Sequence, residues 1–251
     1  MSILPKITSQ SNPLVKAVRR AVARGERTAS GSMIAESVHL LEEALRSGAE
    51  IERVIVSESA MHRIPSSVNA IVLDDRLFEE IAATEASQGV MTLVKPCKWT
   101  MDDMLSATAL VIVLDGLQDP GNAGAIVRAA EAFGATGIVF LKGTVSPYNP
   151  KAIRATAGSL FRLPFLEGML ASEFLKFKIP LYAAMPRSSM MASSANLKAS
   201  CAIAIGSEGR GVSAEIAAAA MPIAIPTAGV ESLNAAVAAG VLLYEARRQR
   251  M

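Results

Sequence analysis

The sequence predicts an α/β protein whose C-terminal part is a mostly parallel sheet flanked by helices. Apolar runs of strand length alternate with helical patterns after residue 108, which is typical of a parallel sheet with right-handed crossovers. Leu110–Leu114 is apolar at every position, as expected for a strand covered on both faces. Three turns rich in glycine and asparagine each follow or include an apolar strand, in Leu114–Gly134, Ala202–Ser213 and Ile223–Gly240. Together these features predict strand ends that supply loops to one site.

The composition is that of a globular chain. Its 251 residues are 51% hydrophobic, 19% charged and 4% aromatic, enough for one large domain or two small ones. No run of about 18 apolar residues occurs, and no apolar run follows the basic N-terminus, so neither a membrane span nor a secretory signal is expected. Cys97 and Cys201 are far apart and outside any ligand-spaced cluster. We therefore expect two reduced, buried thiols, no metal site and a cytoplasmic protein.

Charge divides the chain into three parts. Residues 1–30 carry six basic and one acidic side chain, a net charge of +5. Residues 31–108 have a net charge of −7, and residues 109–251 have a net charge of +4. A polyanionic partner is therefore expected to contact the N-terminal arm and the C-terminal half.

The first expected helix begins near Pro13, which suits a first helical turn. Its apolar positions follow helical spacing, at Leu14, Ala17, Val18 and Ala21. The basic residues fall mostly off that stripe; they include Lys16, Arg19 and Arg20. A solvated basic tail is the alternative interpretation of this arm.

Three segments are expected. A small α/β domain spans residues 1–95, a linker spans 96–108 and contains the only tryptophan, and a second α/β domain spans 109–251. In the first domain, helices are expected at Ser37–Ser47 and Asp75–Thr84, and strands at Glu52–Ser57, Asn69–Leu73 and Val90–Val94. In the second, strands are expected at Leu110–Leu114, Gly137–Leu141, Pro180–Ala184, Cys201–Ile205 and Met221–Ile225, and helices at Gly124–Phe133 and Leu233–Arg250.

The first glycine-marked turn breaks the chain at residues 119–121 (DPG), directly before a helix. Asn122 is expected to cap that helix, because asparagine side chains accept from its free amides. Arg128 lies roughly opposite the apolar face, so it points away from the core. A structural arginine paired to Glu131 or Asp119 is the alternative.

The second and third turns have other features. Gly206–Ser213 (GSEGRGVS) has three glycines in six residues, which allow positive φ angles and close approach to a ligand. In the third turn, Pro226 ends a strand, Ser232 is well placed as an N-cap, and Asn234 falls in the first turn of the last helix. A glycine-rich surface turn and a capped core helix are the respective alternatives.

In this order, the three turns resemble the motifs of the TrmH/SpoU family of RNA 2′-O-ribose methyltransferases, part of the SPOUT superfamily. The resemblance implies a fold with a deep trefoil knot, S-adenosyl-L-methionine as cofactor, and a homodimer formed through the C-terminal domain. The implied catalytic residues are Arg128, Asn122, Glu208, Ser232 and Asn234. The implied cofactor-binding residues are Gly206, Glu208, Gly209, Ile225, Pro226, Ser232, Leu233 and Asn234.

Two further segments resemble the family. Ser146–Phe165 is similar to a K-x-x-R-x-[ST]-x-G segment that helps to build the site. Residues 1–95 resemble, more loosely, a substrate-binding domain similar to kink-turn-binding ribosomal proteins. The residues implied to bind RNA are Lys16, Arg19, Arg20, Lys151, Arg154 and Arg162, with solvated charges as the alternative.

The implied function is transfer of a methyl group from S-adenosylmethionine to a ribose 2′-hydroxyl of RNA, with large-subunit ribosomal RNA favoured and no metal or membrane involved. Arg128 either takes the 2′-hydroxyl proton or only orients the hydroxyl, since a guanidinium has a pKa above about 12. The alternatives are methylation of tRNA, methylation that confers antibiotic resistance, and a non-catalytic RNA-binding or ribosome-assembly factor. A nucleotide-binding oxidoreductase is disfavoured, because the required G-x-G-x-x-G is missing from the first turn.

Overall fold

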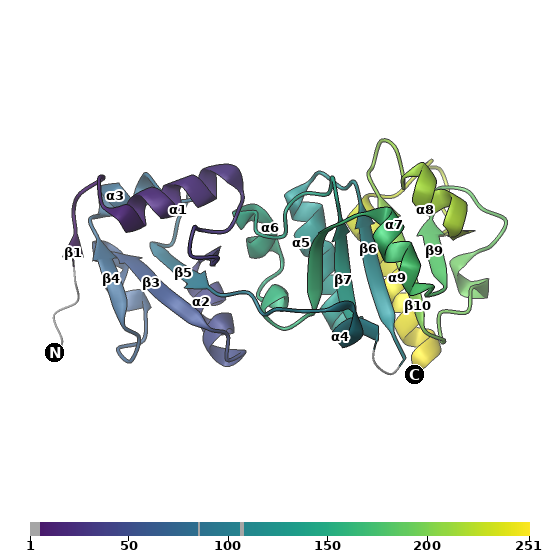
Figure 1. The fold of residues 1–251 in the computed structure, drawn as a ribbon, viewed down its shortest axis with the longest axis horizontal. Helices are drawn as coiled ribbons and strands as arrows, with labels where there is room; N and C mark the ends of the chain where they lie inside the picture. The colour runs from purple at the N-terminus through teal and green to yellow at the C-terminus, as the bar shows by residue number, and fades with distance from the viewer. Residues whose placement is uncertain (1–5, 85, 106–107) are drawn as a thin grey trace. The chain divides into compact units, whose positions relative to one another are not determined.

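The computed structural model describes residues 6–84, 86–105 and 108–251. Contacts divide the chain into two compact units, each built on its own sheet (Figure 1). The first unit comprises Met1–Cys97 and Tyr148–Arg162, and the second comprises Lys98–Pro147 and Leu163–Met251. The segment Tyr148–Arg162, assigned from sequence to the second domain, therefore groups with the first unit.

The first unit has a mixed five-stranded sheet in the order β1-β4-β3-β5-β2. Its strands are β1 (Lys6–Ile7), β2 (Met33–Glu36), β3 (Ile51–Ser57), β4 (Ala70–Leu73) and β5 (Val90–Val94). Strand β5 pairs antiparallel with β2 and β3, whereas β4 pairs parallel with β1 and β3.

The helices of this unit are α1 (Pro13–Arg24), α2 (Val38–Arg46), α3 (Asp75–Glu79) and α6 (Pro150–Ala155), with 3-10 turns η1 (Glu58–Arg63) and η2 (Ser159–Phe161). The expected helix α1 is confirmed, and its buried residues Val15, Val18 and Ala21 join the core with Ile34, Ile55 and Phe78. Helix α6 contacts β2 and buries Ala152 and Ile153. This apolar contact explains why Tyr148–Arg162 belongs to the first unit.

The second unit has a six-stranded sheet in the order β11-β9-β10-β6-β7-β8, and every pairing is parallel. Its strands are β6 (Leu110–Asp115), β7 (Gly137–Leu141), β8 (Phe165–Met169), β9 (Leu181–Ala184), β10 (Cys201–Gly206) and β11 (Met221–Ile223). The central strands β6, β7 and β10 are almost wholly buried, as expected for a sheet covered on both faces. The predicted parallel sheet is therefore confirmed.

The helices of the second unit are α4 (Met101–Leu105), α5 (Pro120–Ala132), α7 (Ala171–Phe174), α8 (Ala214–Ala219) and α9 (Ala235–Arg250), with η3 (Leu175–Phe177) and η4 (Ala192–Ser194). Helix α9 packs against α5 and β10. Arg250, near its end, donates to the carbonyls of Leu197, Thr108 and Ala199 at 2.7–2.9 Å. The end of the C-terminal helix is thus hydrogen-bonded to loops that precede β6 and β10. These loops lie at the opposite end of the strands from the motifs.

Several details differ from the sequence predictions. Strands β2 and β8 and helix α8 were not predicted; β2 is fully buried but ends in the polar Glu36, so it has no continuous apolar run. Helix α4 lies within the predicted linker, whose residues 106–107 are outside the described part. Cys97 is exposed, contrary to the expectation of two buried thiols, whereas Cys201 is buried and its burial raises the pKa of its thiol. Among the described residues, no helix combines the length and apolar composition that crossing a bilayer requires.

Candidate functional site

A pocket of about 480 Å³ opens at the carboxyl ends of β9, β10 and β11. Its walls are the last residues of these strands and the loops that follow them, together with the start of α9. Open parallel sheets bind ligands at this edge, because the loops that follow neighbouring strands converge there. Its volume lies within the usual range of about 300–1,000 Å³ for small-molecule sites.

The glycine-rich loop after β10 folds back on itself. Ser207 and Gly211 exchange backbone hydrogen bonds of 3.1 and 2.9 Å, and Gly211 has a φ of +67°. A Cβ at Gly206 would lie 2.0 Å from the carbonyl carbon of Gly211, so only glycine fits there. A Cβ at Gly209 would meet nothing within 4 Å. The sequence predicted that these glycines allow positive φ angles and close approach of a ligand. Gly206 is instead required because the loop's own backbone packs against it.

A buried carboxylate holds the far end of this loop. Asp115, the last residue of β6, is 7% exposed and accepts a 2.6 Å hydrogen bond from the backbone amide of Ser213. The pair joins residues 98 positions apart in the chain. Sequence reasoning missed Asp115; the signal was an acid ending an otherwise apolar strand.

Side chains from the three motifs form one hydrogen-bonded chain. Asn234 donates from Nδ2 to Oδ1 of Asn122 at 3.1 Å, and Asn122 donates from its own Nδ2 to Oε1 of Glu208 at 2.5 Å. The amide of Asn234 is oriented by the helix, because its Oδ1 accepts from the amides of Ala236 and Val237. Each amide therefore fixes the next, and the chain ends on the carboxylate of Glu208 at the pocket wall.

Two cap predictions were wrong by a few residues. Asp119, not Asn122, caps α5, accepting at 2.6 Å from the amide of Asn122. Asn234, not Ser232, caps α9, which begins at Ala235. The chain enters α5 earlier than expected because Pro120 takes the first helical position. As a result, Asn122 has its side chain free to bridge the other two motifs.

Most residues predicted to bind the cofactor line the pocket; they are Gly206, Glu208, Gly209, Ile225, Ser232, Leu233 and Asn234. Pro226 instead lines a neighbouring depression together with Arg187 and Val230. The prediction missed the contribution of β9, whose end and following residues line the same pocket, including Met185 and Pro186. A proline two residues after a predicted strand was the available signal. Charged residues at the wall include Glu208, Arg210 and Glu231.

Arg128 is exposed on α5, as its spacing predicted. It makes no hydrogen bond or ion pair to another residue in the described part of the chain, so the alternative of a structural pair with Glu131 or Asp119 finds no support. Arg128 is not among the pocket-lining residues. Its catalytic role stays a prediction.

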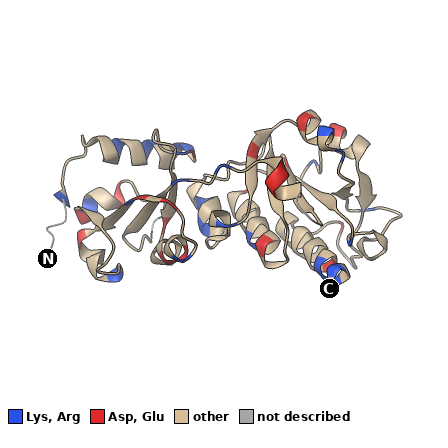
Figure 2. Cartoon of the chain, turned by 60° about the horizontal axis from the view of Figure 1, so that its bottom comes forward, with Lys and Arg blue, Asp and Glu red and all other residues tan. Residues whose placement is uncertain are grey.

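All six residues predicted to bind RNA belong to the first unit, on α1 and in Tyr148–Arg162. Two of them are engaged in ion pairs: Arg19 with Glu80 at 3.0 Å, and Arg162 with the buried Glu43 at 2.8 Å. The other four, Lys16, Arg20, Lys151 and Arg154, are exposed. Figure 2 marks the basic positions along α1 in blue.

The comparisons with known proteins match both units. Residues 109–244 match the SpoU rRNA Methylase family, and residues 12–92 match the MRM3-like substrate binding domain. The chain is 34% identical to an uncharacterized tRNA/rRNA methyltransferase of Synechocystis, covering 99% of this chain and 96% of that one. It is 30% identical to the 23S rRNA (guanosine(2553)-2′-O)-methyltransferase RlmP of Bacillus subtilis, covering 97% and 100%.

A solved structure agrees with this match. The AdoMet-bound rRNA methyltransferase from Sinorhizobium meliloti superposes with a TM-score of 0.84 at 26% identity, covering 99% of both chains. The family match spans the strands and loops that build the pocket and all three motif residues of the hydrogen-bonded chain. This chain therefore belongs to the SpoU family of RNA methyltransferases.

Proposed function

We propose that this protein transfers a methyl group from S-adenosylmethionine to a ribose 2′-hydroxyl of RNA, and that its substrate is large-subunit ribosomal RNA. The observation that carries the proposal is the hydrogen-bonded chain Asn234–Asn122–Glu208 at the wall of the strand-end pocket. It unites one side chain from each of the three motifs on which the family resemblance rests.

The pocket suits S-adenosylmethionine in charge and in shape. When bound, the cofactor supplies a methyl group on a sulfonium, and with its amine and carboxylate it carries a net positive charge. Glu208 and Glu231 outnumber Arg210 at the wall, so the pocket has the complementary sign. Ile205, Ile223 and Leu233 provide apolar surface beside them. The open space beside Gly209 leaves backbone amides accessible to polar groups of the cofactor.

The chain's own residues would act chiefly by alignment. Methyl transfer from a sulfonium is an in-line displacement, which is accelerated when donor and acceptor are held in the reacting geometry. Asn122 is locked by hydrogen bonds at both ends of its amide, and it presents Glu208 in one orientation. Arg128, exposed and without an ion pair to another described residue, is left to orient the ribose hydroxyl or an adjacent phosphate. Ser232 lines the pocket beside Asn234, where its hydroxyl is available to a ligand.

The proposal that ribosomal RNA is the substrate rests on the first unit and on the relatives. The unit that matches the MRM3-like substrate binding domain holds every residue predicted to bind RNA. The Bacillus subtilis relative is named for a 23S rRNA nucleotide. We extend the proposal to recognition of bent or looped RNA, as in kink-turn-binding ribosomal proteins.

Three further properties are part of the proposal. Helix α9 exposes Val237, Val241 and Tyr244 in a stripe, with exposed fractions of 52%, 40% and 57%, which supports a homodimer formed through the second unit. The parallel sheet of the second unit, together with the TM-score of 0.84 between the whole chain and a relative, supports the deep trefoil knot that the family resemblance implies. The third property is a cytoplasmic location, which the proposed ribosomal RNA substrate supports.

The test is transfer of labelled methyl from S-adenosylmethionine to separated, unmodified ribosomal RNA and tRNA, followed by nuclease mapping. A 2′-O-methyl nucleotide in 23S ribosomal RNA is the expected product. Label confined to tRNA would retain the chemistry and reject the substrate. Cofactor binding without transfer to either RNA, naked or in ribosomal particles, would favour a non-catalytic RNA-binding factor.

A further inference from the structure

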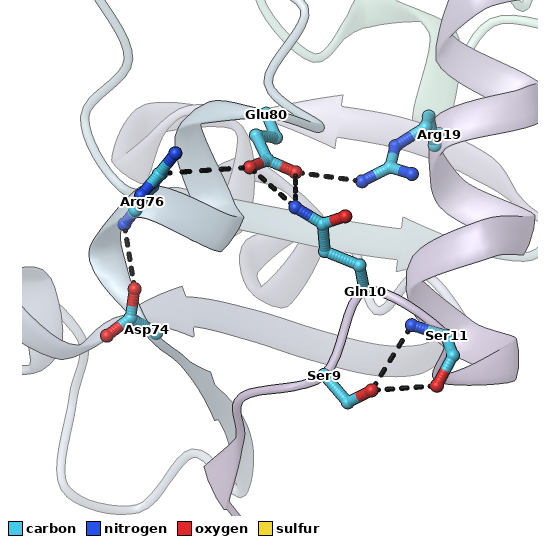
Figure 3. Close-up of polar contacts among 7 residues, drawn as sticks. All are labelled: Ser9, Gln10, Ser11, Arg19, Asp74, Arg76 and Glu80. Atoms are coloured by element: carbon cyan, nitrogen blue, oxygen red, sulfur yellow. Dashed lines mark hydrogen bonds and ion pairs between the residues drawn. The ribbon is translucent and has the colours of Figure 1, made fainter.

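Helix α1 carries two kinds of basic residue. Arg19 donates to Glu80 at 3.0 Å, and Gln10 and Arg76 surround the same carboxylate (Figure 3). The charge of Arg19 is therefore compensated within the unit. Lys16 and Arg20 lie one turn apart, are exposed, and form no ion pair with any residue that the structure describes.

Lys16 and Arg20 line a small pocket between α1 and the loop that follows it. The pocket has a volume of about 190 Å³, and the loop residues Glu26–Ala29 form its other wall. Arg27 adds a third cation at this wall, and its guanidinium lies 4.7 Å from the centre of the Tyr148 ring. Glu26 is the single acid, so the four charged residues leave a net charge of +2.

The loop wall is fixed by backbone geometry. Gly25 ends α1 in the left-handed region with a φ of +64°, which turns the chain back beside the helix. Thr28 then closes a tight turn: its amide donates to the carbonyl of Ser32 at 2.8 Å, and its hydroxyl accepts from the amide of Ser32 at 3.1 Å. The pocket is therefore built before any ligand binds, which lowers the entropic cost of binding.

We propose that this pocket holds one phosphodiester of the RNA backbone, bound by Lys16 and Arg20 while Arg19 serves only the fold. The proposal rests on the proposed function, since it names a contact of that enzyme with its substrate. The net positive charge of this small pocket attracts the negative charge of a phosphodiester. Phosphate contacts of this kind position RNA without reading its sequence.

The test measures binding of the full-length protein to an unmodified 23S ribosomal RNA fragment as a function of salt. Lys16→Ala/Arg20→Ala is compared with Arg53→Ala/Arg76→Ala, which removes the same charge from exposed positions elsewhere in the unit. We expect about tenfold weaker binding and a salt slope lower by about 1 to 2 for the pocket variant only. Glu26→Gln should tighten binding severalfold. Thermal unfolding and S-adenosylmethionine affinity check that each variant is folded.

Equal losses in the two double variants, or no effect of Glu26→Gln, would overturn the phosphodiester site. Methyl transfer by the wild-type protein, measured on the same fragment and on the separated RNAs, reports on the proposed function independently. Wild-type binding that depends on Lys16 and Arg20 without any transfer would reject the enzyme and keep the site. Absence of wild-type binding to the RNA would reject the site.

Discussion

The side-chain amide of Asn122 donates to Oε1 of Glu208 across 2.5 Å, joining residues 86 positions apart in the chain. The other amide atom of Asn122, Oδ1, accepts a hydrogen bond from the Nδ2 of Asn234, which holds the Nδ2 of Asn122 toward Glu208. The helix cap formed by Asn234 thereby sets the orientation of Glu208. A local feature of helix α9 thus controls a carboxylate in a different loop.

Asn122→Asp should lower the rate of methyl transfer about 30-fold, because it places a second carboxylate against Glu208 while retaining the bond from Asn234. A loss of rate of about 30-fold corresponds to about 2 kcal/mol, the cost of a lost hydrogen bond and an unpaired charge. Glu208→Gln alone should cost less. The double variant should recover much of the Asn122→Asp loss, because the new amide can donate to the new carboxylate. Single-turnover rates of methyl transfer, measured with saturating cofactor, give the loss for each of the three variants. Strict additivity of the two losses would show that the bond does not contribute to catalysis.

Arg128→Ala should abolish transfer while the affinity for S-adenosylmethionine stays within about twofold, because Arg128 is absent from the pocket wall. Arg128→Lys should retain only a small part of the rate, since an ammonium lacks the planar fork of a guanidinium. Lys176→Ala, which removes an exposed cation from the same unit, is the control. Rates and cofactor affinity are measured on one preparation. Transfer by Arg128→Ala at the parental rate would exclude the assigned role.

The sequence was sufficient for the parts of the site that lie at strand ends. Continuous apolar runs identify β6 and β10, and the glycine-rich loop after β10 does line the pocket. The hydrogen bonds among Asn122, Glu208 and Asn234 could not be derived from spacing, because they depend on which residue begins each helix. A shift of a few residues in the caps changes which side chains are free, and element boundaries are the least reliable part of a sequence prediction.

Other features depend on contacts between distant segments. The local sequence pattern does not indicate that Tyr148–Arg162 groups with the first unit. Two contacts explain this grouping: helix α6, which buries Ile153, contacts β2, and Arg162 forms an ion pair with Glu43. Asp115 and Ser213 likewise meet only after strands β6 and β10 pair. Such contacts are set by the tertiary structure, which overrides local sequence preference.

The Arg248 guanidinium and the Gln249 amide hold the pKa of Glu245 at about 2, below its ordinary value of 4.5, through hydrogen bonds of 2.8 Å. A carboxylate with a lowered pKa stabilises the fold above pH 4.5, and this contribution is lost as the pH falls toward 2. Glu245→Gln should therefore lower the free energy of unfolding at pH 7 by less than about 1 kcal/mol, since the Arg248 side chain is 56% exposed.

Urea unfolding at pH 7 and at about pH 2 tests this coupling, and the difference between wild type and Glu245→Gln should shrink at the lower pH. Glu215→Gln, at an exposed position on α8, is the control and should show no such change. A difference that persists undiminished in acid would refute the coupling.

Arg250 donates to four backbone carbonyls, those of Leu197, Thr108, Ala109 and Ala199, at 2.7–3.0 Å. Arg250→Ala should destabilise the second unit by about 2 to 3 kcal/mol, because hydrogen bonds to charged groups are strong and the carbonyls lose their partner. For a domain of this size, Tm should fall by about 4 to 12 °C. Arg247→Ala removes an exposed arginine from the same helical turn and should change Tm by less than about 2 °C. Calorimetry measures both variants, and equal shifts would mean that these four bonds add nothing beyond the surface charge of α9.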